Sequence, residues 1–375
     1  MTKPNPKNEM VKREYFRYLR EAGGRDSATI DCVAKSLTRF EESTNRRDFK
    51  RFHREQAVAF KARLRDAVNA RTGERLSKAT VLSALRDLRA FFIWLAREPG
   101  YKSHIAYSDA DYFNLADKDV AVARARREPK PPTPEQMRRV LNAMPAATVL
   151  ERRDRAVVAF AAVTGARVRA LTTFPLGAVD PSLGTVEHDA RLVRTKGGKT
   201  FRSDFHRVVP GAAEIVVDWC AELAECHGWG RSDPLFPQNH MGLDENGGFV
   251  AVGLARKGWA TSEPVRAIFK RAFAAAGIDY HNPHSLRALL VRHYMAMNLT
   301  HAQMKAVSQS LGHADIMTTF SSYGQIPTQR QSELIREIAA GPVDIKSDPV
   351  ADLLAAADRV KPVRALTLGG GGNQR

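Results

Sequence analysis

The sequence predicts a mainly α-helical protein with a small antiparallel β-sheet, an α+β fold in which an N-terminal helical bundle precedes a larger domain. Three observations predict this class. Apolar residues recur at three- or four-residue spacing through much of the 375-residue chain. Residues 185–209 instead alternate as strands do, around a Gly-Gly turn. A basic, proline-rich stretch at residues 123–132 separates the two parts.

The first domain, residues 1–98, is expected to be a bundle of about four helices. They are predicted at residues 10–21, 27–42, 54–70 and 77–97. The last helix has the clearest apolar stripe, which consists of Val81, Leu85, Leu88, Phe92 and Leu95. Lys78 and Arg86 lie off that stripe, so one face of the helix can pack while another meets an anion.

Residues 99–131 are expected to link the two domains. They carry scattered charges and end in ARARREPKPP, whose three prolines oppose continued regular structure. Two interpretations stay open, because such a basic segment either runs along a duplex or serves only as a solvated tether.

The balance of charge favours a polyanionic partner. The formal net charge is +17, which suits nucleic acid or an anionic membrane surface. The first 130 residues hold 29 Lys and Arg against 18 Asp and Glu, a net +11, which leaves 29 against 23, or +6, for residues 131–375. So large an excess favours nucleic acid over a basic surface without a partner.

The sequence predicts neither secretion nor a membrane span. Its first residues lack the apolar core of a signal peptide, and the most apolar run, residues 156–163, is too short to cross a bilayer. The cytoplasm is therefore the expected compartment.

Three cysteines, Cys32, Cys220 and Cys226, do not suggest a disulfide framework. The last two lie six residues apart on one predicted helix and so on different faces, which disfavours a metal site with His227.

The second domain, residues 132–340, opens with a strong helix start at Thr133, which forms a capping box with Gln136. An apolar helix follows and ends at Gly165. Arg167 comes directly after it and is expected at the opening of the next helix, where an anion can bind.

Strands are predicted within residues 185–209, on either side of the turn at Gly197 and Gly198. Lys196 and Lys199 flank this turn. A basic hairpin tip is either a solvated turn or a means to reach into a DNA groove or deliver a proton. The elements expected next are a helix at 213–226, a loop rich in Gly, Asn and Asp at 228–253, and a helix at 262–275.

Residues 281–324 gather the groups best suited to phosphate chemistry. Asn282 is a predicted N-cap followed by Pro283, which places His284 and Arg287 three residues apart in the first turn of a helix. Backbone N–H groups at such a position favour an anion.

A second helix start lies in the same stretch, at the capping box of Thr300 and Gln303. This helix is expected to stop at Gly312, and His313 follows in a loop. Tyr323 then provides a nucleophile in a short polar segment.

In this order, the residues resemble the pattern of the tyrosine recombinase (phage integrase) family, which is Arg, Lys, His-x-x-Arg, His or Trp, and Tyr. The resemblance covers roughly residues 133–330. The catalytic positions that it implies are Arg167, Lys196, His284, Arg287, His313 and Tyr323. Ala170 stands where the family usually has Glu, and Ala288 where it often has His. The N-terminal helices resemble the family's DNA-binding core-binding domain in size and position.

The resemblance implies a site-specific DNA recombinase or integrase that cleaves and rejoins strands through a covalent 3′-phosphotyrosyl intermediate. Tyr323 would attack the phosphate, Arg167 and Arg287 would hold it, and Lys196 would protonate the departing 5′ oxygen. Two arginines can supply the charge that a metal would otherwise provide, so no metal, ATP or other cofactor is expected.

The two histidines have supporting roles in this scheme. His284 would accept or position the tyrosine proton, and His313 would donate a hydrogen bond to phosphate. The partners implied are double-stranded DNA and a tetramer on two DNA sites, in the bacterial cytoplasm and associated with the nucleoid. Residues 341–375 are expected to form a tail whose apolar helix packs on its own domain or on a neighbour.

Two alternatives stay open. A type IB topoisomerase has a similar site but reseals the same strand, and the N-terminal domain and the tail favour recombination over it. A DNA-binding regulator with a degenerate site is the other alternative, which Ala170 would favour. All six positions expected to do chemistry nevertheless carry competent side chains.

Overall fold

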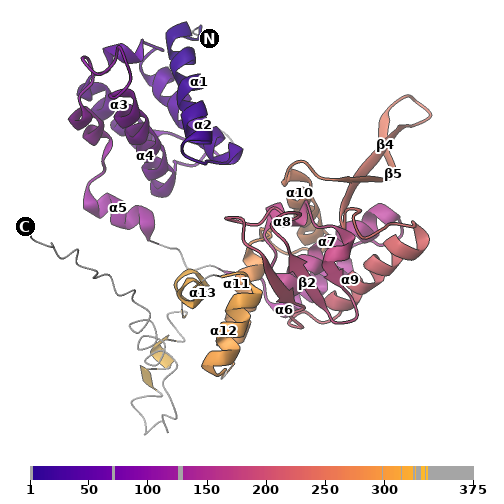
Figure 1. Ribbon diagram of the computed structural model, residues 1–375. Coiled ribbons are helices and arrows are strands. Elements are labelled where there is room, and N and C mark those ends of the chain that lie inside the picture. Colours follow the sequence, from indigo (N-terminus) through magenta and orange to yellow (C-terminus); the bar gives the residue numbers. More distant parts are fainter. Residues whose placement is uncertain are drawn as a thin grey trace, which may run out of the picture. The chain divides into compact units, whose positions relative to one another are not determined.

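The computed structural model describes residues 3–69, 72–125, 130–297, 299–313, 315–323, 326, 331–333 and 335–336. The chain divides into two compact units, residues 1–127 and 128–375, each with its own hydrophobic core (Figure 1). Within the described ranges, no helix combines the length and the apolar character that crossing a membrane requires. The apolar tail predicted at 341–375 lies outside the described residues.

The first unit is a helical bundle, as predicted. Its longer helices are α1 (Pro6–Glu21), α2 (Ser27–Ser43), α3 (Arg54–Asp66) and α4 (Lys78–Leu95), and the 3-10 turn η1 (Phe49–Arg51) joins α2 to α3. Side-chain oxygens of Asn5, Asp26 and Ser77 accept backbone N–H bonds at the starts of α1, α2 and α4. These caps satisfy N–H groups that the helix itself cannot, which is why the helices begin there.

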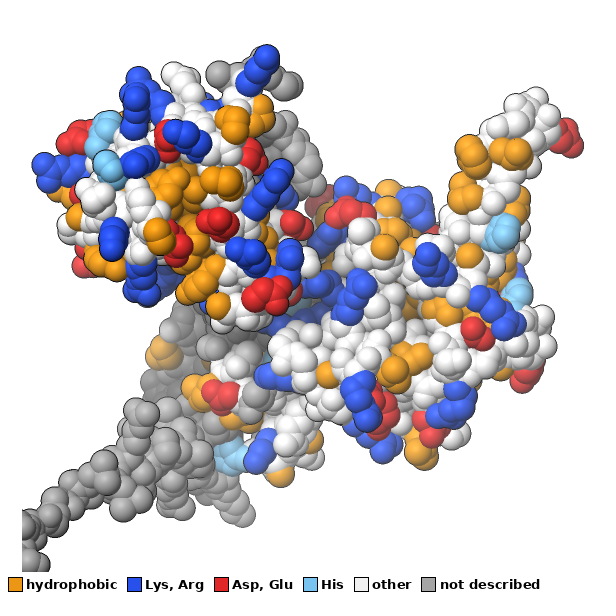
Figure 2. Space-filling view, turned by 45° about the horizontal axis from the view of Figure 1, so that its top comes forward, with side chains coloured by type: hydrophobic (Ala, Val, Ile, Leu, Met, Phe, Trp, Pro, Cys, Tyr) orange, Lys and Arg blue, Asp and Glu red, His pale blue; other side chains and the backbone are white. Residues whose placement is uncertain are grey.

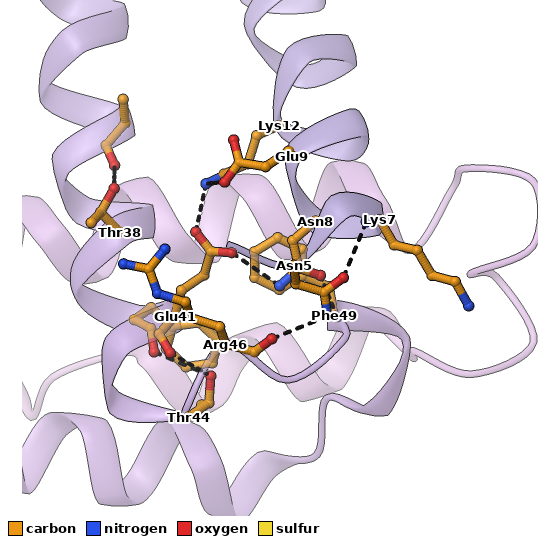
Figure 3. Close-up of polar contacts among 12 residues, drawn as sticks. Asn5, Lys7, Asn8, Glu9, Lys12, Thr38, Glu41, Thr44, Arg46 and Phe49 are labelled. Atoms are coloured by element: carbon orange, nitrogen blue, oxygen red, sulfur yellow. Dashed lines mark hydrogen bonds and ion pairs between the residues drawn. The ribbon is translucent and has the colours of Figure 1, made fainter. Parts of the chain in front are cut away.

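A buried ion pair joins α1 to α2 (Figure 3). Lys12 Nζ lies 2.6 Å from Glu41 Oε2, and the Glu41 side chain is only 2% exposed. Asn8 donates to the other carboxylate oxygen of Glu41 at 3.0 Å, while its own Oδ1 accepts the backbone N–H of Phe49. The charge of Glu41 is therefore paired and hydrogen-bonded, which is the condition for burying it without a large penalty.

Much of the segment predicted as a linker belongs to the first unit. The 3-10 helix η2 (Tyr107–Phe113) contacts α3 and α4, and the helix α5 (Asp117–Arg124) contacts α4. Ile105, Ala110 and Phe113 are buried in the core of this unit. The segment expected as a linker at 99–131 thus contains two helical segments that pack on the first unit, because burial of these apolar side chains outweighs the scattered charges around them.

The second unit is built around α7 (Val149–Thr164), which is buried from Ala156 to its end. The other helices that surround this core are α6 (Pro134–Ala143), α8 (Val168–Leu171), α9 (Ala212–Ala221), α10 (Glu263–Ala275), α11 (Ser285–Met295), α12 (His301–Ser310) and α13 (Ile316–Tyr323). A π-helical turn, η4 (Glu222–Cys226), continues α9. The capping box of Thr133 and Gln136 is present at the start of α6 as predicted.

A small antiparallel sheet lies beside these helices. Its strands are β1 (Val179–Asp180), β2 (Thr185–His188) and β3 (Phe201–Asp204), in the order β1-β2-β3, and a 3-10 turn, η3 (Leu176–Ala178), precedes β1. The observed strands β2 and β3 are shorter than the strands predicted within residues 185–209. Residues 189–200 form a long loop between them instead of a two-residue turn. Within that loop the N–H of Arg194 donates to the Thr173 hydroxyl, not to a neighbouring strand.

The prediction of a loop at residues 228–253 is also wrong. β4 (Pro237–Leu243) and β5 (Phe249–Gly258) pair there as an antiparallel hairpin, which extends away from the body of the second unit (Figure 1). The Gly, Asn and Asp residues that suggested a loop lie in its turn, at 244–248. The pairing of the flanking residues is a contact between segments, which local composition does not reveal.

Candidate active site

Arg167 lies where α7 gives way to α8. The helix α7 ends at Gly165, whose φ of 58° is left-handed, and Arg167 is the N-cap of α8, as predicted. A Cβ on Gly165 would lie 2.9 Å from Leu311 Cδ2 and 3.1 Å from Leu290 Cδ1. Glycine is therefore required at this turn both for its backbone conformation and for its lack of a side chain.

Arg287 is a buried cation on α11, with only 2% of its surface exposed. Its Nη1 donates to the carbonyl oxygen of Gly165 at 2.8 Å, and its Nε donates to His313 Nε2 at 3.3 Å. The carbonyl lies at the C-terminal end of α7, where the partial negative charge of a helix favours a cation. Two acceptors from separate segments thus orient the guanidinium.

A chain of hydrogen bonds determines which nitrogen of His313 carries the proton. Thr319 on α13 donates its hydroxyl proton to Ser308 Oγ at 2.9 Å, and its Oγ1 lies 2.7 Å from His313 Nδ1. Arg287 already donates to Nε2, so in the neutral ring the proton is on Nδ1, from which it is donated to Thr319. His313 therefore acts here as an acceptor toward Arg287.

Burial, helped by the surrounding cations, keeps the two site histidines neutral. Burial, and next the charge of Arg287, lowers the pKa of His313 to about 4. Burial likewise lowers the pKa of His284, followed by the charges of Arg287, Arg167 and Lys196. Both rings are therefore uncharged at neutral pH.

His284 differs in position from the prediction. α11 begins at Ser285, so His284 is its N-cap and precedes the first turn. Asn282 still acts locally, because its Oδ1 accepts the backbone N–H of His284 at 3.0 Å. The proline between them adopts a turn, so the helix starts later than its capping signal suggested. The three-residue spacing to Arg287 is unchanged.

Lys196 is exposed on the loop at 189–200, beside two glycines with positive φ. It lines one small cavity of about 10 Å³ together with Arg167 and Arg287. Another wall is Ala170, the position at which the resembled family usually has Glu. The structure thus brings together three of the predicted residues from three separate segments.

Tyr323 is the last residue of α13, and its side chain lies outside the described part of the structure. Thr319, which lies four residues earlier on the same helix, is fully buried. Another tyrosine near the predicted site, Tyr294, bonds through its hydroxyl to His206 Nδ1 at 2.9 Å. Tyr294 is thus part of a structural contact between α11 and the segment after β3.

Sequence reasoning missed the supporting residues Ser308 and Thr319. The Thr-Thr pair before Tyr323 was visible in the sequence, and its second member lies one helical turn from the tyrosine. Its contact with His313 depends on the packing of α13 against α12, which no local pattern specifies. In the described ranges no group of three His, Cys, Asp or Glu residues could hold a metal ion.

Comparison with known proteins identifies the family of the second unit. The phage integrase family matches residues 132–330, more than half of the chain. Tyrosine recombinase XerC of Corynebacterium efficiens is 30% identical over 189 residues, which are 50% of this chain and 50% of that relative. The chain thus spans about half the length of that relative. XerC of Xylella fastidiosa strain 9a5c is 27% identical over 271 residues, or 69% of this chain and 74% of the relative.

A solved structure of a known recombinase has a similar fold. A crystal structure of a lambda integrase dimer bound to a COC′ core site matches with a TM-score of 0.57 and 17% identity, over 84% of this chain and 77% of that one. Such low identity speaks for the fold alone. The family match over more than half of the chain shows that this chain belongs to the phage integrase family, the tyrosine recombinases, which are enzymes that cleave and rejoin DNA strands at specific sites.

Proposed function

We propose that this recombinase cleaves DNA through a covalent 3′-phosphotyrosyl intermediate formed by Tyr323. The observation that carries the proposal is the meeting of Arg167, Lys196 and Arg287 around one cavity. Arg287 also donates to His313, and the charges of all three cations act on His284. A dianionic, five-coordinate phosphate needs positive charge that is already in place, and such preorganised charge is usually the largest catalytic contribution. No divalent metal or nucleotide enters this scheme.

Each bond change can be assigned to a residue of the chain. The Tyr323 oxygen forms a bond to phosphorus while the bond from phosphorus to the 5′ oxygen breaks. His284 accepts the tyrosine proton, and its lowered pKa leaves the ring unprotonated at neutral pH. Lys196 gives a proton to the departing 5′ oxygen, and Arg167 and Arg287 donate to the non-bridging oxygens.

Rejoining follows from the same chemistry. The phosphotyrosyl bond retains the energy of the original phosphodiester, so a 5′ hydroxyl can attack it and reverse the step. Attack by the hydroxyl of a second DNA molecule exchanges strands. That outcome requires two DNA sites held together, and we propose a tetramer of this chain for this purpose, with the basic first unit also contacting the duplex.

The test compares the natural chain with Tyr323→Phe. Both are incubated with sheared DNA from the source genome, and protein bound covalently to DNA is recovered under denaturing conditions and sequenced. The natural chain is expected to yield adducts at a defined site. Tyr323→Phe should yield none while retaining DNA binding in gel shifts, because only the nucleophilic oxygen is lost.

Tyr294→Phe is the matched control and should still form adducts, since the Tyr294 hydroxyl is bonded to His206. Adducts that persist in Tyr323→Phe and vanish in Tyr294→Phe would overturn the assignment of the nucleophile.

A further inference from the structure

The hairpin of β4 and β5 carries large apolar side chains in an exposed position. Phe249 is 80% exposed, Leu243 64% and Met241 50%. Leu243 pairs with Phe249 and Met241 pairs with Ala251, so these side chains share one face of the ribbon, hereafter the apolar face. Figure 2 shows hydrophobic side chains along the hairpin, which stands apart from the body of the unit. A contiguous apolar surface of this kind marks an interaction site.

The opposite face is built differently. Val250 and Val252 lie there, and a Cβ on Gly242 would be only 2.9 Å from Val252 Cγ1. Val252 therefore covers Gly242, while Val252 and Val250 are themselves 59% and 37% exposed. The apolar face is the side that carries the larger exposed side chains, Met241, Leu243 and Phe249.

Charge is distributed unevenly along the hairpin. Asp244 and Glu245 lie in the turn, and no Lys or Arg occurs from residue 237 to 255, although the chain carries +17. Figure 2 shows the acidic side chains at the tip. At the other end, Arg256 and Lys257 are exposed at the foot of β5. The acidic tip and the basic foot are separated by roughly 27 Å, given about 3.4 Å for each residue from 249 to 257.

This polarity identifies the partner. We propose that the hairpins of two copies of this chain pack antiparallel through their apolar faces, about a two-fold axis. The rotation places the tip of each hairpin beside the foot of the other, so Glu245 of each copy meets Lys257 of its partner copy. One surface then satisfies both sides of the contact, as a two-fold interface requires. DNA is a poor occupant, because the acidic tip repels phosphate and the apolar face offers no donors.

The contact is small, and its size determines where it forms. A single hairpin face buries less than the roughly 1,200 Å² of total surface found in stable complexes. Copies held on neighbouring stretches of DNA have a high effective concentration, so the pair is expected on DNA and not in dilute solution. The inference goes beyond the proposed chemistry, since it requires DNA binding but not strand cleavage.

Photo-crosslinking tests the contact directly. Phe249 is replaced by p-benzoylphenylalanine in two full-length preparations that carry different affinity tags. They are mixed on a duplex of arbitrary sequence, which the basic chain binds without a specific site, and irradiated. A covalent product that contains both tags is expected. The same amino acid at Leu183, which is 66% exposed in the turn between β1 and β2, is the control and should give little of it.

Charge reversal then tests the geometry. Glu245→Lys or Lys257→Glu places like charges together at both ends of the pair, so either change should lower the yield roughly tenfold. The two changes combined in one chain restore opposite charges and should restore the product. These residues are exposed, so folding is not at risk, and circular dichroism verifies it.

Three results would overturn the proposal. One is a two-tag product no stronger than that from the Leu183 position. Another is crosslinking of residue 249 to DNA in its place. The third is a combined variant that stays as weak as either single reversal. Loss of adducts in Tyr323→Phe bears only on the proposed chemistry, so the two failures can be told apart.

Discussion

Replacement of Thr319 by valine tests whether the hydrogen-bond chain through His313 orients Arg287. Thr319 is fully buried, and valine has nearly the same shape, so the change removes a hydroxyl without opening a large cavity. His313 Nδ1 then loses the oxygen that lies 2.7 Å away, and Ser308 loses its donor at 2.9 Å.

The magnitude follows from these two losses. A buried donor without an acceptor costs roughly 1–3 kcal/mol, so the free energy of unfolding should fall by about 2 kcal/mol. His313 can escape this cost by carrying its proton on Nε2 instead. Nε2 then no longer accepts from Arg287, and the guanidinium loses one of its two orienting bonds. Strand cleavage should slow by roughly ten- to a hundredfold, at a factor of ten for each 1.4 kcal/mol.

The assay is single-turnover adduct formation on a nicked substrate that carries the site recovered by sequencing, alongside urea unfolding. Thr319→Ser is the matched control, because it keeps the hydroxyl and loses a buried methyl at a cost of about 1 kcal/mol. It should cleave within about threefold of the natural chain. Cleavage by Thr319→Val at the natural rate, or equal slowing in the serine variant, would refute the proposed role of the hydroxyl.

Three further predictions concern the second unit. Lys196→Ala should regain cleavage on a substrate whose 5′ leaving oxygen is replaced by sulfur, which departs without a proton, and rescue of Lys199→Ala instead would reassign the general acid. Burial lowers the pKa of His206 from 6.5 to about 4, so the unfolded chain binds a proton that the folded chain does not. Stability should therefore fall by about 3 kcal/mol as pH drops from about 6.5 to about 4, and urea titrations should show a smaller decline in His206→Gln. Gly312→Ala should destabilise the unit by more than about 1 kcal/mol in the same titrations, since its φ is 66° and a Cβ would lie 2.5 Å from Phe201 Cζ.

The sequence by itself determined the elements that depend on neighbouring residues. The capping boxes of Thr133 with Gln136 and of Thr300 with Gln303 are present as predicted, because each needs only residues three apart. Gly165 ends α7 for an equally local reason, its left-handed backbone. The candidate catalytic residues could also be identified from the sequence, because their order resembles the pattern of a known family. The roles of these residues remain predictions.

The errors arose where an element depends on a distant partner. The turn residues at 244–248 were evident, but the strands beside them are recognisable only once β4 and β5 pair. Residues 105–113 were predicted as part of a linker because they have few apolar side chains, and these become buried only by packing against α3 and α4. Residues 189–200 leave the sheet through a bond to Thr173, a residue on another segment.

Only the tertiary structure decided how the candidate site is held together. Arg287 bonds to the carbonyl of Gly165, 122 residues earlier, and to His313, 26 residues later. Spacing along the chain cannot specify such contacts, because they depend on how α7, α11 and the loop after α12 pack around one core. The same packing brings Thr319 to His313 and so selects the protonated nitrogen of that ring. The sequence named the reacting groups, whereas folding determined their hydrogen-bond partners and with them their orientation and charge.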